Sequence, residues 1–135
     1  MATMKLEIVT PEAKIYSGDV EMVTLPGIEG EMGILPMHAP LMTQVVPGEL
    51  IARYDGRDHF LAVGEGFVEI TGDRVAVMTD MAMKADDIDE MQAEEARKRA
   101  EARLSQKLGD EETAAVQASL AHSLAQLKVK RRTRS

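Results

Sequence analysis

The residues that interrupt helices are confined to one part of the chain. All 5 prolines and nearly all of the 10 glycines lie before residue 84, and the rest of the chain has no proline. Because proline and glycine are unfavourable inside helices and common in turns, the first part cannot consist of long helices. The change in composition predicts two domains, residues 1–84 and 85–135, with a boundary near Met83–Ala85.

The first domain has the pattern of an all-β structure. Lys5–Ile8 alternates polar and apolar residues, which is the period of a half-buried strand. Asp55-Gly56 separates two alternating runs and is typical of a type I′ hairpin turn. Turn formers also separate the other β-branched runs, which are 19–25, 41–46, 50–54, 60–63, 67–70 and 75–79. Short strands at this spacing predict a β-sandwich or a barrel.

Residues 86–129 have the pattern of two helices. Asp86 or Asp87 can cap the first helix, Gly109 is placed to end it, and Asp110 to cap the second. The first helix presents one apolar face, made of Ala96, Ala100, Leu104 and Leu108. The second helix carries a row of small residues, Ala114, Ala118, Ala121 and Ala125, beside a stripe of Val116, Leu120, Leu124 and Leu127. The short connection predicts an antiparallel hairpin, and we expect the alanine row to bring the two helices close together.

The charges are distributed unevenly. The formal net charge is −7, and the first domain holds this excess of acidic residues, which argues against general nucleic-acid binding. A basic tail ends the second domain: Lys128, Lys130, Arg131, Arg132 and Arg134. Such a cluster favours an anionic partner, and the alternative is a frayed, solvated end. The absence of cysteine excludes disulfides, cysteine-bound zinc and thiol catalysis.

No known catalytic, metal-binding or targeting pattern occurs in the sequence. His38, His59 and His122 lie far apart without metal-ligand spacing, and there is no phosphate-binding loop or nucleophile motif. No apolar run approaches the roughly 20 residues that span a bilayer, and the N-terminus has no signal-peptide or transit-peptide pattern. We therefore expect no catalytic residue and no metal site. A small enzyme on a β-sandwich is the rival reading, and it would need a buried Asp/His cluster with shifted pKa values.

Several segments together resemble the epsilon subunit family of F-type ATP synthases. The segment Gly30–Pro40, which we expect to be an irregular loop, resembles the family's characteristic loop. Phe60–Ile70 is similar to a second family segment, and Val75–Asp80 followed by Asp86–Asp89 is similar to the junction before its helices. The similarity runs in order from about residue 4 to 127. It implies an α+β fold, an antiparallel β-sandwich of about ten strands followed by an antiparallel two-helix hairpin.

The resemblance also implies partners. The sandwich would pack against the gamma subunit of the central stalk, and the loop around Glu31 would face the ring of c subunits in the membrane. The interface residues implied are Glu29, Glu31, Gly33 and His38. The alternative for the two glutamates is that they are merely solvated acids. Met37 departs from the family, which usually has a smaller residue there, and Glu65 interrupts what is often a Gly-Gly pair.

Some epsilon subunits bind ATP at the start of the first helix, through an Ile/Leu-Asp-x-x-Arg-Ala motif. This chain keeps Ile88, Asp89 and Ala93 but has Gln92 in place of the arginine, and Arg99 remains as a phosphate partner. An amide cannot make the charge-assisted contact of a guanidinium, so the resemblance implies weak ATP binding at most. The alternative is an ordinary helix start.

The implied function is that of a non-catalytic subunit, which couples ion-driven rotation to ATP synthesis. Its helical hairpin would inhibit ATP hydrolysis, with the basic tail reaching the alpha and beta subunits when the helices extend. The expected location is the cytoplasmic side of a bacterial inner membrane, as a peripheral protein. A free-standing nucleotide sensor using the Asp89 region is a second rival, and binding to a gamma-like partner would exclude it.

Overall fold

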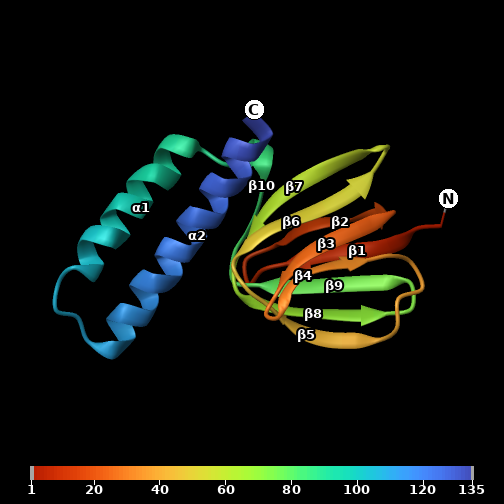
Figure 1. The fold of residues 1–135 in the computed structure, drawn as a ribbon, viewed down its shortest axis with the longest axis horizontal. Coiled ribbons are helices and arrows are strands. Elements are labelled where there is room, and N and C mark those ends of the chain that lie inside the picture. Colours follow the sequence, from red (N-terminus) through yellow and green to blue (C-terminus); the bar gives the residue numbers. More distant parts are fainter. Residues whose placement is uncertain (1, 135) are drawn as a thin grey trace.

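The computed structural model describes residues 2–134, and side chains from residue 2 to 133. It contains a sheet of ten strands followed by two α-helices (Figure 1). The strands are β1 (Met4–Val9), β2 (Lys14–Val20), β3 (Met22–Gly27), β4 (Gly30–Ile34), β5 (Leu41–Val45), β6 (Gly48–Tyr54), β7 (Arg57–Val63), β8 (Gly66–Thr71), β9 (Arg74–Thr79) and β10 (Ala82–Lys84). A short 3-10 turn, η1 (Ala85–Asp87), leads to α1 (Glu90–Leu104) and α2 (Asp110–Arg134).

The sheet has the order β10-β7-β6-β3-β5-β8-β9-β1-β2, with β4 paired to β3 outside this path. It folds over on itself into a sandwich, and alternate residues of its strands fill the space between the layers. The core consists of aliphatic side chains such as Leu6, Ile8, Leu25, Leu50 and Ile70. The expected sandwich of about ten strands followed by a helical hairpin is confirmed. One strand pair is parallel, since β1 runs beside β9 with Lys5 opposite Arg74.

The expected hairpin turn at Asp55-Gly56 is confirmed by its backbone. Asp55 has φ 54° and Gly56 has φ 73°, the left-handed pair that a type I′ turn requires. The expected strand 19–25 is instead divided between β2 and β3, with Glu21 between them. The prediction of one irregular loop over Gly30–Pro40 is wrong in its first half, because Gly30–Ile34 forms β4. The glycines of that segment favour a loop, but Met32 and Ile34 alternate with exposed residues as in a strand.

The helix ends differ from the expected ones. Neither Asp86 nor Asp87 caps α1, because both lie in η1, and the Asp89 side chain accepts a hydrogen bond from the backbone N–H of Gln92 at 3.1 Å. The first helix ends at Leu104 rather than at Gly109, and the Ser105 hydroxyl then donates to the carbonyl of Ala102.

The connection between the helices is correspondingly longer than expected. The Gly109 carbonyl accepts from the backbone N–H of Thr113, which starts α2. Asp110 is therefore the first residue of the helix rather than its cap. The two helices still form the predicted antiparallel hairpin (Figure 1). No helix within residues 2–134 is long and apolar enough to cross a membrane.

The alanine row of α2 faces the sandwich, so the expectation that it joins the two helices is wrong. Ala114, Ala118 and Ala121 line a gap with Pro47 and Glu65 of the sandwich. Ala125 continues this row, where it packs with Val129 against Ala62 of β7 and Ile88. The expectation failed because α2 lies between α1 and the sandwich and presents a different face to each. Its face toward α1 includes Ala115, Val116, Ser119 and Ser123.

Candidate interaction surfaces

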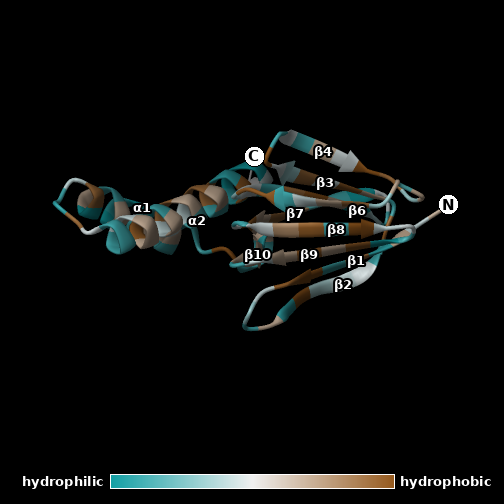
Figure 2. Cartoon of the chain, turned by 90° about the horizontal axis from the view of Figure 1, so that it is seen from below, coloured by the Kyte–Doolittle hydropathy of each residue, from teal (hydrophilic) through white to brown (hydrophobic). Residues whose placement is uncertain are grey.

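The β3–β4 hairpin projects at one edge of the sandwich, where β3 is the one partner of β4 among the described strands (Figure 2). Met32 and Ile34 of β4 point inward, which leaves Glu31 and Gly33 exposed on the other face. Glu29 lies in the exposed two-residue turn that precedes β4, beside the exposed Ile28. The hairpin therefore presents two carboxylates and an apolar side chain at its tip.

His38 does not belong to this tip. It follows β4, whereas Glu29 precedes it, and five residues of strand span roughly 14 Å. The loop from Leu35 to Pro40 is therefore at the opposite end of the strand from the turn. The imidazole Nδ1 of His38 lies 2.6 Å from the carbonyl oxygen of its neighbour Ala39. The structure thus separates one of the four expected interface residues from the other three.

The loop that holds His38 presents apolar side chains to solvent. Met37 is 88% exposed and Leu35 is also exposed. Met37 has φ 70°, a left-handed conformation that costs a residue with a Cβ roughly 1–2 kcal/mol. An exposed apolar loop held in a strained conformation is typical of a binding surface.

The outer face of β5, β8 and β9 carries an apolar patch that the sequence analysis missed. Phe67 of β8 pairs directly with Met78 of β9 and with Gln44 of β5, and Met42 lies two residues along the same face of β5. Met42, Phe67 and Met78 are all exposed. Alternation along β8 and β9 was visible in the sequence, but it did not reveal which face remains uncovered.

The expected nucleotide-binding residues line one cavity. Asp89, Ala93 and Arg99 border a space of about 400 Å³ between α1, α2 and the segment that leads into α1. Gln92 of α1 and His122 and Gln126 of α2 also line it. The remaining charged groups of the lining are Asp87 and Glu95, so three carboxylates face one guanidinium. This balance is unfavourable for a triphosphate, and the Asp89 carboxylate already caps α1.

The basic tail is bound to its own chain. The ammonium of Lys130 donates to the carbonyl of Ala85 at 3.2 Å. Arg131 pairs with Glu90 and Glu94 of α1, at 3.3 and 3.0 Å, and Arg132 pairs with Glu49 of β6 at 2.9 Å. Lys128 is exposed, and the side chain of Arg134 lies outside the described residues. Lys130, Arg131 and Arg132 are therefore paired within the chain, although the side chains of Arg131 and Arg132 are still 52% and 53% exposed.

A network of charges crosses from α1 to α2. The Arg97 guanidinium donates to Glu94 and also pairs with Glu101 at 2.7 Å. The hydrogen bond from Arg97, followed by the charges of Arg97 and Arg131, holds the pKa of the Glu94 carboxyl below its usual range. Glu94 is therefore an anion at neutral pH, held between one cation of its own helix and one of the tail.

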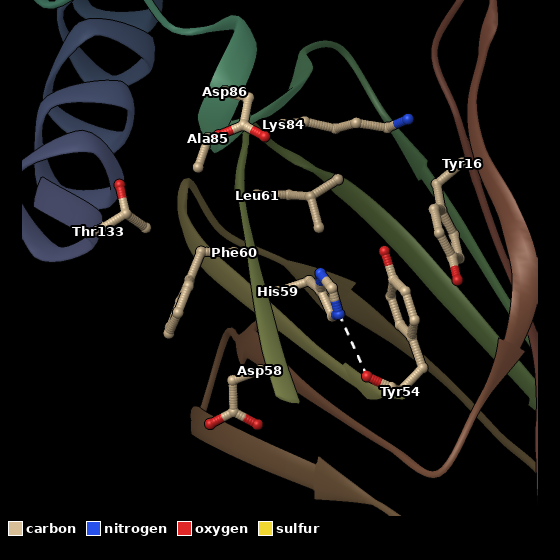
Figure 3. A pocket seen from close by; sticks show the side chains of 10 residues that line it. All are labelled: Tyr16, Tyr54, Asp58, His59, Phe60, Leu61, Lys84, Ala85, Asp86 and Thr133. Atoms are coloured by element: carbon tan, nitrogen blue, oxygen red, sulfur yellow. Dashed lines mark hydrogen bonds between the residues drawn. The ribbon is translucent and has the colours of Figure 1, made fainter. Parts of the chain in front are cut away.

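A small cavity lies where the end of α2 meets the sheet. It has a volume of about 230 Å³ and is lined mainly by aromatic and polar side chains from six elements, β2, β6, β7, β10, η1 and α2 (Figure 3). The ring of His59 stacks on Tyr54 with centroids 3.6 Å apart, and its Nε2 lies 3.2 Å from the Tyr54 carbonyl oxygen. Burial, followed by the neighbouring Tyr54, raises the pKa of Tyr16 to about 12. The described residues hold no group of three His, Asp or Glu side chains arranged for a metal ion.

Comparison with known proteins matches the chain over both domains. The model of the ATP synthase delta/epsilon chain β-sandwich domain matches residues 3–85, and that of the long α-helix domain matches residues 86–131. Among curated proteins, the ATP synthase epsilon chain of Dehalococcoides mccartyi strain CBDB1 is 47% identical, with 99% of this chain and 96% of that protein covered. The epsilon chain of Laribacter hongkongensis is 43% identical, with 95% and 93% covered.

Solved structures match the fold. A chain of the Euglena gracilis mitochondrial ATP synthase, in a structure of OSCP, F1 and c-ring, has a TM-score of 0.77 at 24% identity, and the alignment covers 95% of this chain and 81% of that one. A chain from the central stalk and c-ring of the Tetrahymena thermophila enzyme has a TM-score of 0.62 at 13% identity, covering 98% and 96%. With both domain models matched in order and close relatives covered along nearly their whole length, the chain belongs to the ATP synthase delta/epsilon chain family.

Proposed function

We propose that the chain is the epsilon subunit of the central stalk of a bacterial F-type ATP synthase, and that it catalyses no reaction itself. It links the stalk to the membrane rotor ring, so that ion flow, rotation and ATP synthesis remain coupled, and its helices inhibit ATP hydrolysis. The observation that carries the proposal is the ordered match of both domains to the family. In this role the chain is a peripheral protein on the cytoplasmic side of the inner membrane.

The gamma subunit is the proposed partner of the outer face of β5, β8 and β9. The exposed side chains of Met42, Phe67 and Met78 form an apolar patch on one sheet face, which is the kind of surface that stable interfaces bury. Size-exclusion chromatography tests this directly, because the chain should co-elute with a gamma subunit from the same source.

Two variants make the chromatography specific to the patch. Phe67→Asp places a carboxylate at its centre and should abolish co-elution. Met91→Asp introduces the same charge at an exposed apolar residue of α1 and should leave co-elution intact. Independent elution of the unmodified chain at micromolar concentration would contradict the assignment to the stalk.

The rotor ring is the proposed partner of the β3–β4 hairpin. Glu29, Glu31 and Gly33 gather at this exposed hairpin, where the carboxylates can accept hydrogen bonds from basic or amide groups. His38, at the other end of β4, is assigned to the stalk instead. A photo-crosslinker at residue 31 in the assembled enzyme should label a c subunit, and one at residue 38 should not. Equal labelling of the ring from both positions would refute this division.

Inhibition of ATP hydrolysis is assigned to α1 and α2, which would reach the alpha and beta subunits after leaving the sandwich. A chain truncated after Ala85, reconstituted into the complete enzyme, should give faster ATP hydrolysis while ion-coupled synthesis continues. Neutralising all five bases of the tail should reproduce part of this rise, and the effect should shrink at high salt. Unchanged hydrolysis after truncation, at low and high ATP, would make the hairpin a passive brace.

A further inference from the structure

Three consecutive bases near the end of α2 bind three different elements. Lys130 donates to the carbonyl of Ala85 in η1, and Arg131 pairs with Glu90 and Glu94 on α1. Arg132 reaches the sheet, where its Nε lies 2.9 Å from a carboxylate oxygen of Glu49 on β6. A tail that merely followed the helix would leave its bases in solvent. Here each base holds α2 to a separate part of the chain.

The contact with Glu49 restricts the position of α2 more than the other two contacts do, because the carboxylate is buried. Its side chain is only 5% exposed. The strand register places Glu49 opposite Ala62, which packs beneath Ala125 and Val129 of α2. The carboxylate therefore lies in the seam between the sheet and α2. A buried carboxylate without a cation is strongly unfavourable, so this acid favours the position of α2 that brings Arg132 to it.

Arg132 is also held from its other side. Its guanidinium carbon lies 5.4 Å from the centre of the Phe60 ring on β7, a cation–π contact. Figure 3 shows Phe60 on the side of β7 that faces the last turn of α2, near Thr133. The aromatic ring and the buried carboxylate together form a receptor for one guanidinium. Arginine suits such a site better than lysine, because its planar group can pair and stack at once.

We propose that Glu49 and Phe60 of the sheet, Glu90 and Glu94 of α1, and the bases Lys130, Arg131 and Arg132 form a latch that keeps α2 docked on the sandwich. While the latch is closed, Arg131 and Arg132 are occupied by acids of their own chain. Any acidic surface that binds the tail must first compete with those acids. The latch thus sets how readily the helices leave the sandwich, and this last consequence rests on the proposed inhibitory role.

The two residues of the ion pair differ in the surroundings of the charge that remains when the other charge is removed. Removing the charge of Glu49 leaves Arg132, whose side chain is 53% exposed and can be hydrated. Removing the charge of Arg132 leaves the Glu49 carboxylate in a site that water barely reaches. Arg132→Gln should therefore open the latch more than Glu49→Gln does. The double variant should be less open than the sum of the two effects, because neither charge is then left alone.

Hydrogen exchange of the complete chain measures the latch without any partner. We expect backbone amides of residues 125–133 to exchange about tenfold faster in Arg132→Gln, and a few-fold faster in Glu49→Gln. Lys128→Gln is the matched control, because it removes an exposed base of the same tail and should leave exchange unchanged. Equal exchange in all three variants, or an additive double variant, would overturn the latch.

The assembled enzyme separates the latch from the inhibitory role. Glu49→Gln frees the tail with all its bases intact and should slow ATP hydrolysis further. Arg132→Gln frees the tail but removes one of its cations, so it should inhibit less than Glu49→Gln. Faster exchange in the isolated chain, together with hydrolysis that does not change in either variant, would support the latch and overturn the inhibitory role. Unchanged exchange would overturn the latch whatever hydrolysis does.

Discussion

Val129 offers a direct measure of how strongly α2 is docked on the sheet. Its side chain is 0% exposed and packs with Ala62, Ile88 and Ala125. Val129→Ala removes two methyl groups, each worth about 0.8 kcal/mol when buried, so about 1.6 kcal/mol of transfer free energy is lost. Alanine returns roughly 0.5 kcal/mol through its better helix propensity. The net loss of about 1 kcal/mol should raise the population of undocked helix about fivefold.

Hydrogen exchange at the C-terminal half of α2 is the assay, because an undocked helix loses the packing that limits the opening of its own hydrogen bonds, while the sandwich stays folded. Leu124→Ala is the control, since it deletes a larger side chain from the same helix at a position that is 48% exposed. The control should change exchange by less than about twofold. If the two variants exchange at the same rate, the cluster around Val129 does not hold α2, and the docking must reside in the ion pairs alone.

Other substitutions and conditions test the remaining parts of the structure. Gln92→Arg should tighten ATP binding in titration calorimetry, because a charged hydrogen bond is worth about 1.5–3 kcal/mol, and micromolar affinity of the unmodified chain would contradict this expectation. Folding raises the pKa of Tyr16 to about 12. The stabilising contribution of the neutral Tyr16 phenol is therefore complete below pH 10 and is lost as the pH rises through 12. Tyrosinate absorbance should appear at a higher pH in the folded chain than in urea. Gly66→Ala would place its Cβ 1.9 Å from the backbone oxygen of Met78, and urea unfolding should show a loss of about 1–3 kcal/mol, whereas an unchanged midpoint would mean that β9 can shift.

Acidification should weaken the contact between the tail and α1. The pKa of Glu94 is lowered in the folded chain, so its stabilising contribution is present above the pKa of the unfolded chain and is lost as the pH falls through the lower, folded value. The described partners of this carboxylate are Arg97 and Arg131. Protection of the amides at the end of α2, measured against the intrinsic exchange rate at each pH, should therefore fall below the ordinary titration range of glutamate, and Glu94→Gln should weaken that dependence.

Local patterns predicted the elements whose chemistry is local. The Asp55-Gly56 turn needs two residues in the left-handed conformation, and few residue pairs adopt that conformation at low energetic cost. Strand β4 was missed because Gly30 and Gly33 suggested a loop, although the period of two continued through Ile34. In the helical domain the observed caps differ from the predicted ones by a few residues. Several neighbouring aspartates could each accept a hydrogen bond from the backbone N–H groups at the start of a helix.

Contacts between distant segments could not be predicted in the same way. Glu49 and Arg132 lie far apart in the sequence, and nothing in either neighbourhood marks the pair. Glu94 pairs with Arg97 of its own helix, and it also binds Arg131 from the other helix. Phe67 and Met78 form a patch because no element within residues 2–134 covers that face of the sheet. The sequence showed which residues were amphipathic, and tertiary packing decided which faces were covered.

The sandwich and the docked helix α2 are stabilised by different kinds of contact, and the proposed release of α2 depends on that difference. The sandwich core is a continuous cluster of Leu, Ile and Val between two layers of sheet, so it does not depend on the helices. Beneath α2 the cluster is small, with alanine at Ala62 and Ala125, and ion pairs supply the rest of the contact. In the proposed latch, small side chains and exchangeable charges leave α2 open to competition, because another acidic surface would replace Glu49, Glu90 and Glu94 as the counter-ions of the tail. A docking face built of leucine would hold α2 more firmly, and an acidic surface could then not release it by replacing the counter-ions of the tail.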